Sequence, residues 1–144
     1  MSAFVRFDDL DGLNSVIARG FGAWGPVVTI DQPTIDGFAA ATSSPAPPGY
    51  APDFLLPCLL PKVRPDNDWT IDGHRNALHL GCPEIRFLQP VRVGASVHCR
   101  SRLAAAALHP RGVRVTMDFE VENVADAAPC MRLSIELLYQ GDAA

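Results

Sequence analysis

The second half of the chain alternates apolar and polar side chains, and this alternation limits the possible folds more than any other feature. Between residues 113 and 121 every second residue is apolar, and residues 131–139 repeat the pattern. Residues 78–82 and 97–103 show a shorter version of it. Successive side chains of a strand point to opposite faces, so the pattern predicts strands with one buried and one wet face. Turn residues at 110–112 and 123–128 predict hairpins, and therefore an antiparallel sheet.

The first half of the chain shows helical spacing instead. Apolar residues in 10–17 favour a short helix, and 27–30 is typical of a short strand. Asp31 is placed to cap a helix over 32–42, because its side chain can accept from the first free amides. Residues 54–63 are apolar but contain two prolines, which favours a kinked, buried helix over a central strand. Residues 64–74 are polar and rich in turn residues, and a linker is expected there. These elements together predict an α+β fold.

Length and charge exclude several classes of protein. The 144 residues suit a single domain spanning 1–144. A net charge of −4 disfavours binding to nucleic acid, which requires a basic surface. The sequence has no apolar run long enough to span a membrane, and its first residues do not resemble a signal peptide. We therefore expect a cytoplasmic protein with no nucleic-acid or membrane partner.

The cysteines and histidines do not predict a metal site. Cys58, Cys82, Cys99 and Cys130 lie far apart, without a Cys-x-x-Cys pair, and the four histidines lack ligand spacing. Each cysteine has an apolar or strand-like context, which favours buried and reduced thiols.

Four segments in order carry a resemblance to a known family. They are Trp24-Gly-Pro-Val-Val-Thr-Ile-Asp-Gln with Phe38-Ala-Ala-Ala-Thr, then Leu55 to Val63, then Leu78-His-Leu-Gly, and finally Glu84-Ile-Arg-Phe-Leu-Gln-Pro-Val-Arg-Val-Gly. Together they resemble MaoC-like (R)-specific enoyl-CoA hydratases, particularly the branch named after nodulation protein N. The resemblance implies a hot-dog fold, in which an antiparallel sheet wraps around a central buried helix.

The resemblance also implies a chemistry, and the residues for it are missing. Members of this family hydrate trans-2-enoyl-CoA with an Asp and a His in a Gly-Asp-x-x-x-x-His loop after the first helix. Water needs a base and the α-carbon needs an acid, so both groups are required. Aligned on residues 38–42, Ser44 stands where the Asp belongs and Gly49 where the His belongs. Neither side chain can carry out the proton transfers, so we expect no hydratase dyad here.

Other residues offer a second way to build a site. Asp53 precedes the expected central helix and His79 lies on the first long strand, so an Asp53/His79 pair is one hypothesis for a thioesterase or an altered hydratase. The simpler alternatives are that Asp53 caps the helix and that His79 is a hydrogen-bonded strand residue. Tyr50, Phe54 and Arg86 are candidate substrate-binding residues. Arg86 is placed either to contact CoA phosphate or to brace the sheet. The simpler alternative for Arg86, and for Arg92, Arg100 and Arg102 nearby, is a solvated strand face with cross-strand ion pairs to Asp118, Glu120 and Glu136.

Three functions remain open from the sequence. The first is an acyl-CoA-binding protein of lipid metabolism without the dyad, acting as the non-catalytic partner of an active hydratase subunit. The second is an enzyme that uses Asp53 and His79. The third is a structural module whose groove is closed by Tyr50, Pro52 and Phe54. The expected ligand is an acyl-CoA or enoyl-CoA thioester, with coenzyme A only as part of that ligand and no other cofactor. The expected assembly is a homodimer or a heteromer with another hot-dog protein.

Overall fold

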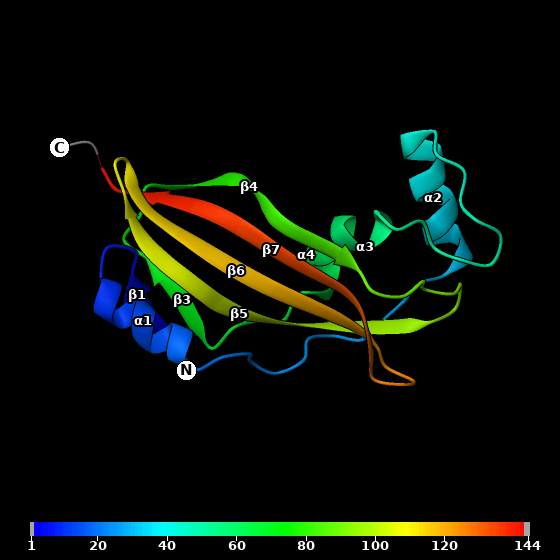
Figure 1. Cartoon of the computed structure of the whole chain (residues 1–144), viewed down its shortest axis with the longest axis horizontal. Helices are drawn as coiled ribbons and strands as arrows, with labels where there is room; N and C mark the ends of the chain where they lie inside the picture. The colour runs from blue at the N-terminus through cyan, green and yellow to red at the C-terminus, as the bar shows by residue number, and fades with distance from the viewer. Residues whose placement is uncertain (1, 143–144) are drawn as a thin grey trace.

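A curled antiparallel sheet forms the body of the protein, as seen in a computed structural model that describes residues 2–142 (Figure 1). Five strands follow the order β2-β5-β6-β7-β4. The strands of this sheet are β2 (Val28–Thr29), β4 (Asn76–Phe87), β5 (Ser96–His109), β6 (Gly112–Asn123) and β7 (Ala128–Gln140). The remaining elements are β1 (Ala3–Arg6), α1 (Leu10–Ala18), α2 (Gln32–Thr42), α3 (Leu55–Cys58), α4 (Leu60–Val63) and β3 (Trp69–Asp72).

The two hairpins confirm the expectation from the alternating pattern. β5 pairs antiparallel with β6, and β6 with β7, across the turns at 110–111 and 124–127. Val113, Val115 and Val121 are each at most 3% exposed, whereas the residues that alternate with them, such as Arg114 and Glu120, lie on the other face of the sheet. The α+β class and the antiparallel sheet around a buried helical segment are therefore confirmed.

The central helical segment differs from the single kinked helix that we expected. It consists of two four-residue helices, α3 and α4, which meet at Leu59. Pro61 explains the break, because it has no amide to donate to the carbonyl of Pro57 and its ring crowds that carbonyl. Pro61 instead lies in the first turn of α4, where no such donor is required.

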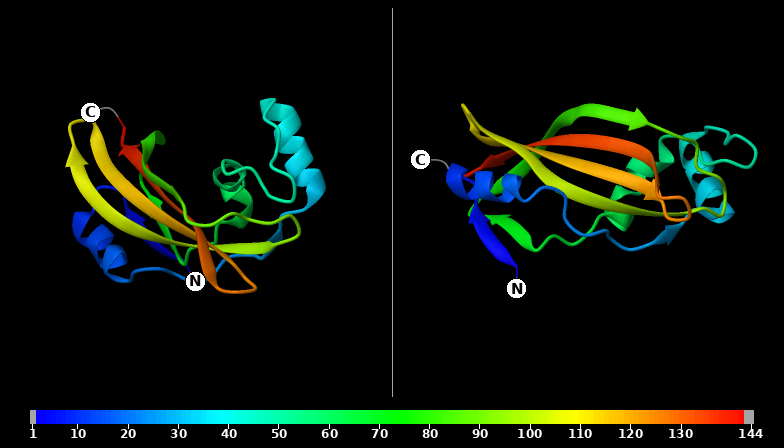
Figure 2. Two further views of the ribbon diagram at one scale, coloured as in Figure 1. Left: turned by 45° about the vertical axis from the view of Figure 1, so that its right-hand side comes forward. Right: turned by 60° about the horizontal axis from the view of Figure 1, so that its bottom comes forward.

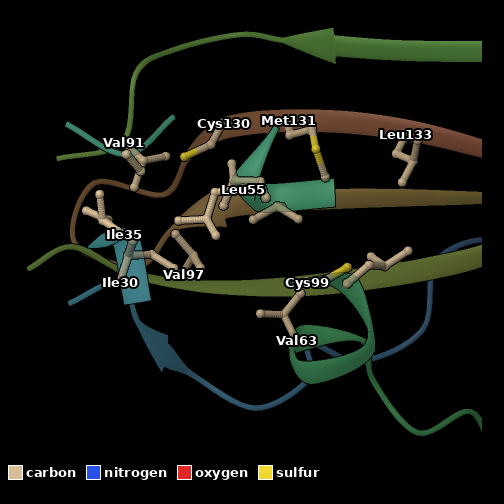
Figure 3. Packing of buried hydrophobic residues seen from close by; sticks show 14 residues of the cluster. Ile30, Ile35, Leu55, Val63, Val91, Val97, Cys99, Cys130, Met131 and Leu133 are labelled. Carbon is tan, nitrogen blue, oxygen red and sulfur yellow. The ribbon is translucent and has the colours of Figure 1, made fainter. Parts of the chain in front are cut away.

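Both short helices still bury their apolar side chains against the sheet. Leu55 and Val63 are 2% and 1% exposed, and they pack with residues of β5 and β7 such as Cys99 and Met131 (Figure 3). Burying a side chain of this size contributes about 1.5–3 kcal/mol. The segment therefore keeps the packing role of a central helix, although over a short length.

The expected linker at 64–74 contains a strand. β3 pairs in parallel with β1, with Ala3 opposite Trp69 and Val5 opposite Ile71. The sequence did not indicate this pairing, since the strand has four residues among turn residues and its partner lies at the start of the chain. Together with α1, these strands cover one end of the sheet, where Leu13 and Leu103 form part of a second apolar cluster.

The expectation of four buried cysteines is only half correct. Cys99 and Cys130 are buried, but Cys58 and Cys82 are exposed, on α3 and on β4. Burial raises the pKa of Cys99 to about 12, so its thiol is protonated at neutral pH. All four thiols are free.

Helix α2 begins and ends as the sequence predicts, and it projects from one end of the sheet (Figure 2). The Asp31 carboxylate accepts from the Thr34 amide at 2.9 Å and from its hydroxyl at 2.6 Å. The helix ends at Ser43, which has φ 54° and ψ 29°, in the left-handed region. A residue with a Cβ is strained there, and glycine is not. No helix among the described residues is long and apolar enough to cross a membrane.

We predict that Ser43→Gly stabilises the protein by up to about 1 kcal/mol, because glycine removes the left-handed strain at the end of α2. The measurement is the free energy of unfolding from urea denaturation. Ser44→Gly is the matched control, since Ser44 has no positive φ and glycine there only loosens the unfolded chain. If Ser43→Gly destabilises the protein as much as Ser44→Gly does, the explanation by left-handed strain is wrong.

Candidate functional site

The segment at 43–51, where the family resemblance places a catalytic loop, is fixed by its backbone. The Gly49 carbonyl accepts from Val93 at 3.1 Å, and the Ala51 amide donates to Val91 at 2.8 Å. Between them, Tyr50 forms a single antiparallel bridge with Arg92, whose guanidinium lies 5.3 Å from the centre of the tyrosine ring. The segment is thus tied to the chain between β4 and β5 rather than reaching into a groove.

The backbone at residue 49 is adapted to glycine. Gly49 has φ +79°, and a Cβ built there would meet no atom within 4 Å. A side chain therefore has space but pays a conformational penalty of about 1–2 kcal/mol. Ser44 is exposed, and its amide donates to the Ala39 carbonyl at 3.2 Å. These two positions supply no acid and no base.

The space in front of this segment is very small. Its lining includes Asp53, Leu56, Phe87 and Gln89, and the cavity volume is about 10 Å³. Phe54 is 59% exposed, and its ring meets the Phe87 ring edge to face at 5.3 Å. The first amide of α3, that of Leu55, already donates to the Pro52 carbonyl at 3.0 Å. The cavity at this end of the fold is therefore too small for a thioester group. The Leu55 amide is also already bonded, so it is not free to donate a hydrogen bond to a thioester oxygen.

Asp53 does not cap the helix, contrary to the simpler expectation. The residue at the cap position of α3 is Phe54, and no side chain provides a cap hydrogen bond. Asp53 itself is exposed, and no hydrogen bond from its side chain is found within residues 2–142. The reason is local, since the chain already has helical backbone angles at Phe54, one residue after Asp53.

His79 lies on β4 opposite Leu137 of β7 and lines a different cavity from Asp53. The cavity that His79 borders has a volume of about 250 Å³, and Leu60 and Pro61 of α4 form another part of its wall. The two candidate residues thus border separate spaces within one chain. Their pairing in catalysis stays a prediction.

Arg86 lies opposite Arg132 in the β4–β7 register and forms an ion pair with Glu84, two residues earlier on the same strand. Arg86 forms no cross-strand ion pair within residues 2–142. The expected cross-strand pairs are confirmed for Arg100 with Glu120 and for Arg102 with Asp118, each at 2.8 Å. The two carboxylates are partly buried, which suits a bracing role for this face of the sheet.

Strand β4 is exposed along its whole length, whereas the sequence predicted one buried face. It is an edge strand, and among residues 2–142 only β7 pairs with it. Several of the large apolar side chains that remain exposed lie on or next to this edge. They are Phe54, Leu78, Leu80, Ile85, Phe87 and Leu88, each between 37% and 59% exposed. We call this set the apolar edge. An exposed apolar edge of this length is a typical surface for pairing with another chain.

Sequence reasoning missed part of the lining of the concave face. A second cavity, of about 400 Å³, includes Arg64, Asn67, Trp69 and Tyr139 in its wall. Three of these residues lie in the stretch that looked like a linker, so their role depended on the unrecognised strand β3. Tyr139 carried a usable signal, because it ends the alternating apolar pattern of the last strand.

Comparisons with known proteins identify the fold. No family profile matches the sequence, and no curated protein matches it. Among solved structures, the ChsH1–ChsH2 complex from Mycobacterium tuberculosis matches with a TM-score of 0.68 at 15% identity, over 91% of this chain and 95% of that one. A MaoC-like dehydratase from Rhodospirillum rubrum matches with a TM-score of 0.62 at 12% identity, over 83% and 91% of the two chains. An (R)-hydratase from A. caviae involved in PHA biosynthesis matches with 0.60 at 15%, over 84% and 96%. At these identities the likeness establishes the fold alone.

We predict that Asp53→Ala changes the free energy of unfolding by less than about 0.5 kcal/mol, because the exposed carboxylate forms no hydrogen bond. Asp31→Ala is the matched control, since Asp31 does cap its helix, and it is expected to lower the melting temperature clearly more. Urea and thermal unfolding of both variants provide the measurement. If Asp53→Ala destabilises the protein as much as Asp31→Ala does, then Asp53 caps α3 after all. Loss of thioester hydrolysis with unchanged stability would instead make Asp53 a catalytic residue.

Proposed function

We propose that this chain, which has the same hot-dog fold as a MaoC-like dehydratase and an (R)-hydratase, binds an acyl-CoA thioester without hydrating it. In this proposal it acts as the non-catalytic subunit beside a second hot-dog protein. The main support is the segment at 43–51. Its two dyad positions hold Ser44 and a glycine with positive φ, and the space in front of it is about 10 Å³.

Binding is supported by the concave face. The cavity beside His79 and the one beside Tyr139 have volumes of about 250 and 400 Å³, which lie in or near the range of small-molecule sites. They lie on the side of the central segment that the closed loop does not reach. A subunit with a wide hollow and no dyad suits a pair in which the other subunit supplies the chemistry to a bulky acyl group.

Assembly is supported by the apolar edge. It combines the unpaired backbone groups of an edge strand with large exposed apolar side chains, and both are satisfied when a neighbouring sheet continues through β4. A solved structure with this fold is itself a complex of two different proteins, ChsH1 and ChsH2. We favour a different hot-dog subunit over a second copy, because a pair of identical copies would contain no dyad.

The enzyme alternative keeps one supporting observation. His79 borders a cavity with apolar walls, as a group acting on an acyl thioester would. Asp53 borders another space, so this alternative requires a different partner for His79. The structural module is supported by the small volume in front of Asp53, but the hollow beside His79 counts against it.

We predict that medium-chain saturated and enoyl-CoA thioesters raise the melting temperature of the purified protein more than free coenzyme A does. A ligand that binds only the folded state stabilises it by mass action, by about 2.7 kcal/mol at a concentration one hundred times Kd. The same enoyl-CoA samples should show no loss of absorbance from hydration. The measurements are a thermal-shift series and a spectrophotometric hydratase assay.

Free coenzyme A at equal concentration controls for binding of the nucleotide part alone. Hydration of any enoyl-CoA by the isolated protein would contradict the non-catalytic role. An unchanged melting temperature with every thioester would contradict binding and would favour the structural module.

We predict that Phe87→Lys weakens assembly roughly tenfold or more, because it places a charge within the apolar edge, where Phe87 meets Phe54. A tagged form of the protein is purified from native extract, and its partner is identified by mass spectrometry. The expected partner is a hot-dog protein with an intact Gly-Asp-x-x-x-x-His loop, captured by the wild type and not by the variant.

Leu108→Lys is the matched control, since Leu108 is 76% exposed at the tip of the β5–β6 hairpin, outside the apolar edge. It should capture the partner as the wild type does. A strict homodimer in extract, or equal loss of the partner in both variants, would contradict the proposed assembly.

A further inference from the structure

The two cavities of the concave face adjoin each other. Both are lined by Arg64, Met117, Phe119 and Leu137, so they form one hollow that runs over β6 and β7. Along β7 its walls extend from Ile135 to Tyr139. The four steps from one residue to the next over this range span roughly 13 Å of strand. The hollow is therefore elongated, with α4 beside one end and β3 beside the other.

The chemistry of the walls changes along this hollow. Around His79 the walls are apolar and include Leu60, Pro61 and Ile135. Beyond Arg64 the walls become polar. The polar residues of that end are Asp66, Asn67, Thr70, Ser101 and Tyr139. An occupant that fits both ends must be apolar at one end and polar at the other.

The polar end offers hydrogen-bond donors in particular. Ser101 is only 3% exposed and donates its hydroxyl to the Asn67 side-chain oxygen at 3.1 Å, which leaves the Asn67 amide nitrogen as a donor. Arg64 forms no ion pair with any residue in the described range 2–142. Burial raises the pKa of Tyr139, so its phenol keeps its proton.

One feature of the polar end disfavours an anionic occupant. The Asp66 carboxylate lines the same cavity as Arg64, and a second carboxylate there would experience its repulsion. The polar end therefore combines several hydrogen-bond donors with the negative charge of Asp66. This combination suits a neutral oxygen acceptor, such as that of a ketone or a hydroxyl.

We propose that the acyl group bound here is apolar beside His79 and carries a neutral oxygen acceptor at the end that reaches Arg64 and Tyr139. This inference rests on the proposed function, because it names the class of acyl group within the same hollow. Arg64 is then a specificity-determining residue, which discriminates between acyl groups by what lies at their far end.

The test compares matched pairs of thioesters by isothermal titration calorimetry with the purified protein. The probes are octanoyl-CoA and dodecanoyl-CoA, each beside its analogue with a ketone on the penultimate carbon, and beside the dicarboxylic analogue of equal length. In at least one pair the ketone is expected to bind about three- to tenfold more tightly than the plain chain, as one net hydrogen bond allows. The dicarboxylic analogue is expected to bind no more tightly than the ketone.

Arg64→Met keeps a flexible, unbranched side chain but removes the guanidinium donors, and it should abolish the preference for the ketone over the plain chain. Tyr139→Phe, which removes only the hydroxyl, should reduce the same preference. Arg111→Met is the control, because Arg111 lies in the β5–β6 turn and lines neither cavity, and it should preserve the preference.

Two results would overturn the inference, and they differ from each other. Plain and ketone chains that bind equally, or a preference unchanged in Arg64→Met, would refute the role of Arg64 while leaving thioester binding intact. An absence of binding for every probe would refute the proposed function, and this inference with it.

Discussion

The missing amide of Pro61 determines much of this structure. Without it the central helical segment divides into α3 and α4, which end at Val63. A curled sheet must be covered along its whole concave face, and two single turns cover only part of it. The far part is covered instead by α1, β1 and β3, which supply their own apolar cluster. The hollow beside His79 and Tyr139 lies where these two covers meet.

The short connection between α2 and α3 also explains why the hollow lies where it does. Ten residues, 44–53, connect Ser43 at the end of α2 to Phe54, and four of them are prolines. Proline reduces the entropy that the unfolded segment loses on folding, which suits a short rigid connection. Such a connection packs against residues 91–93 and fills the space in front of α3. The hollow is therefore at the opposite end of the central segment.

The sequence predicted the features that depend on neighbours along the chain. The strands β6 and β7 follow from alternation over nine residues, and the cap of α2 follows from Asp31 and its position before a proline. It did not predict β3, because a four-residue parallel strand is specified by its distant partner β1 rather than by its own pattern. The two thiols expected to be buried but found exposed, Cys58 and Cys82, lie in apolar segments whose burial a single chain does not complete.

The candidate site, like the fold, could be predicted only in part from the sequence. The expectation that the dyad is missing came from comparing Ser44 and Gly49 with the family's loop pattern, since it concerns which residues are present. The lining by Arg64 and Tyr139 required the structure, because it depends on how the end of α4 faces the last strand. Residues 64–74 gave no sign of a ligand site, as polar turn residues are typical of any surface loop.

The edge strand adds a constraint on any partner. Between His79 and Glu84 the β4–β7 register shifts twice, and Pro83 in this stretch has no amide to donate. Bulges and prolines prevent indiscriminate pairing at an edge, because an incoming strand cannot form a continuous ladder. A partner can therefore pair fully only with 76–79 or with 84–87, and it must accommodate the irregular middle. A chain with an ordinary flat edge does not meet this condition, so the same irregularity that limits aggregation also selects for a partner with a complementary edge.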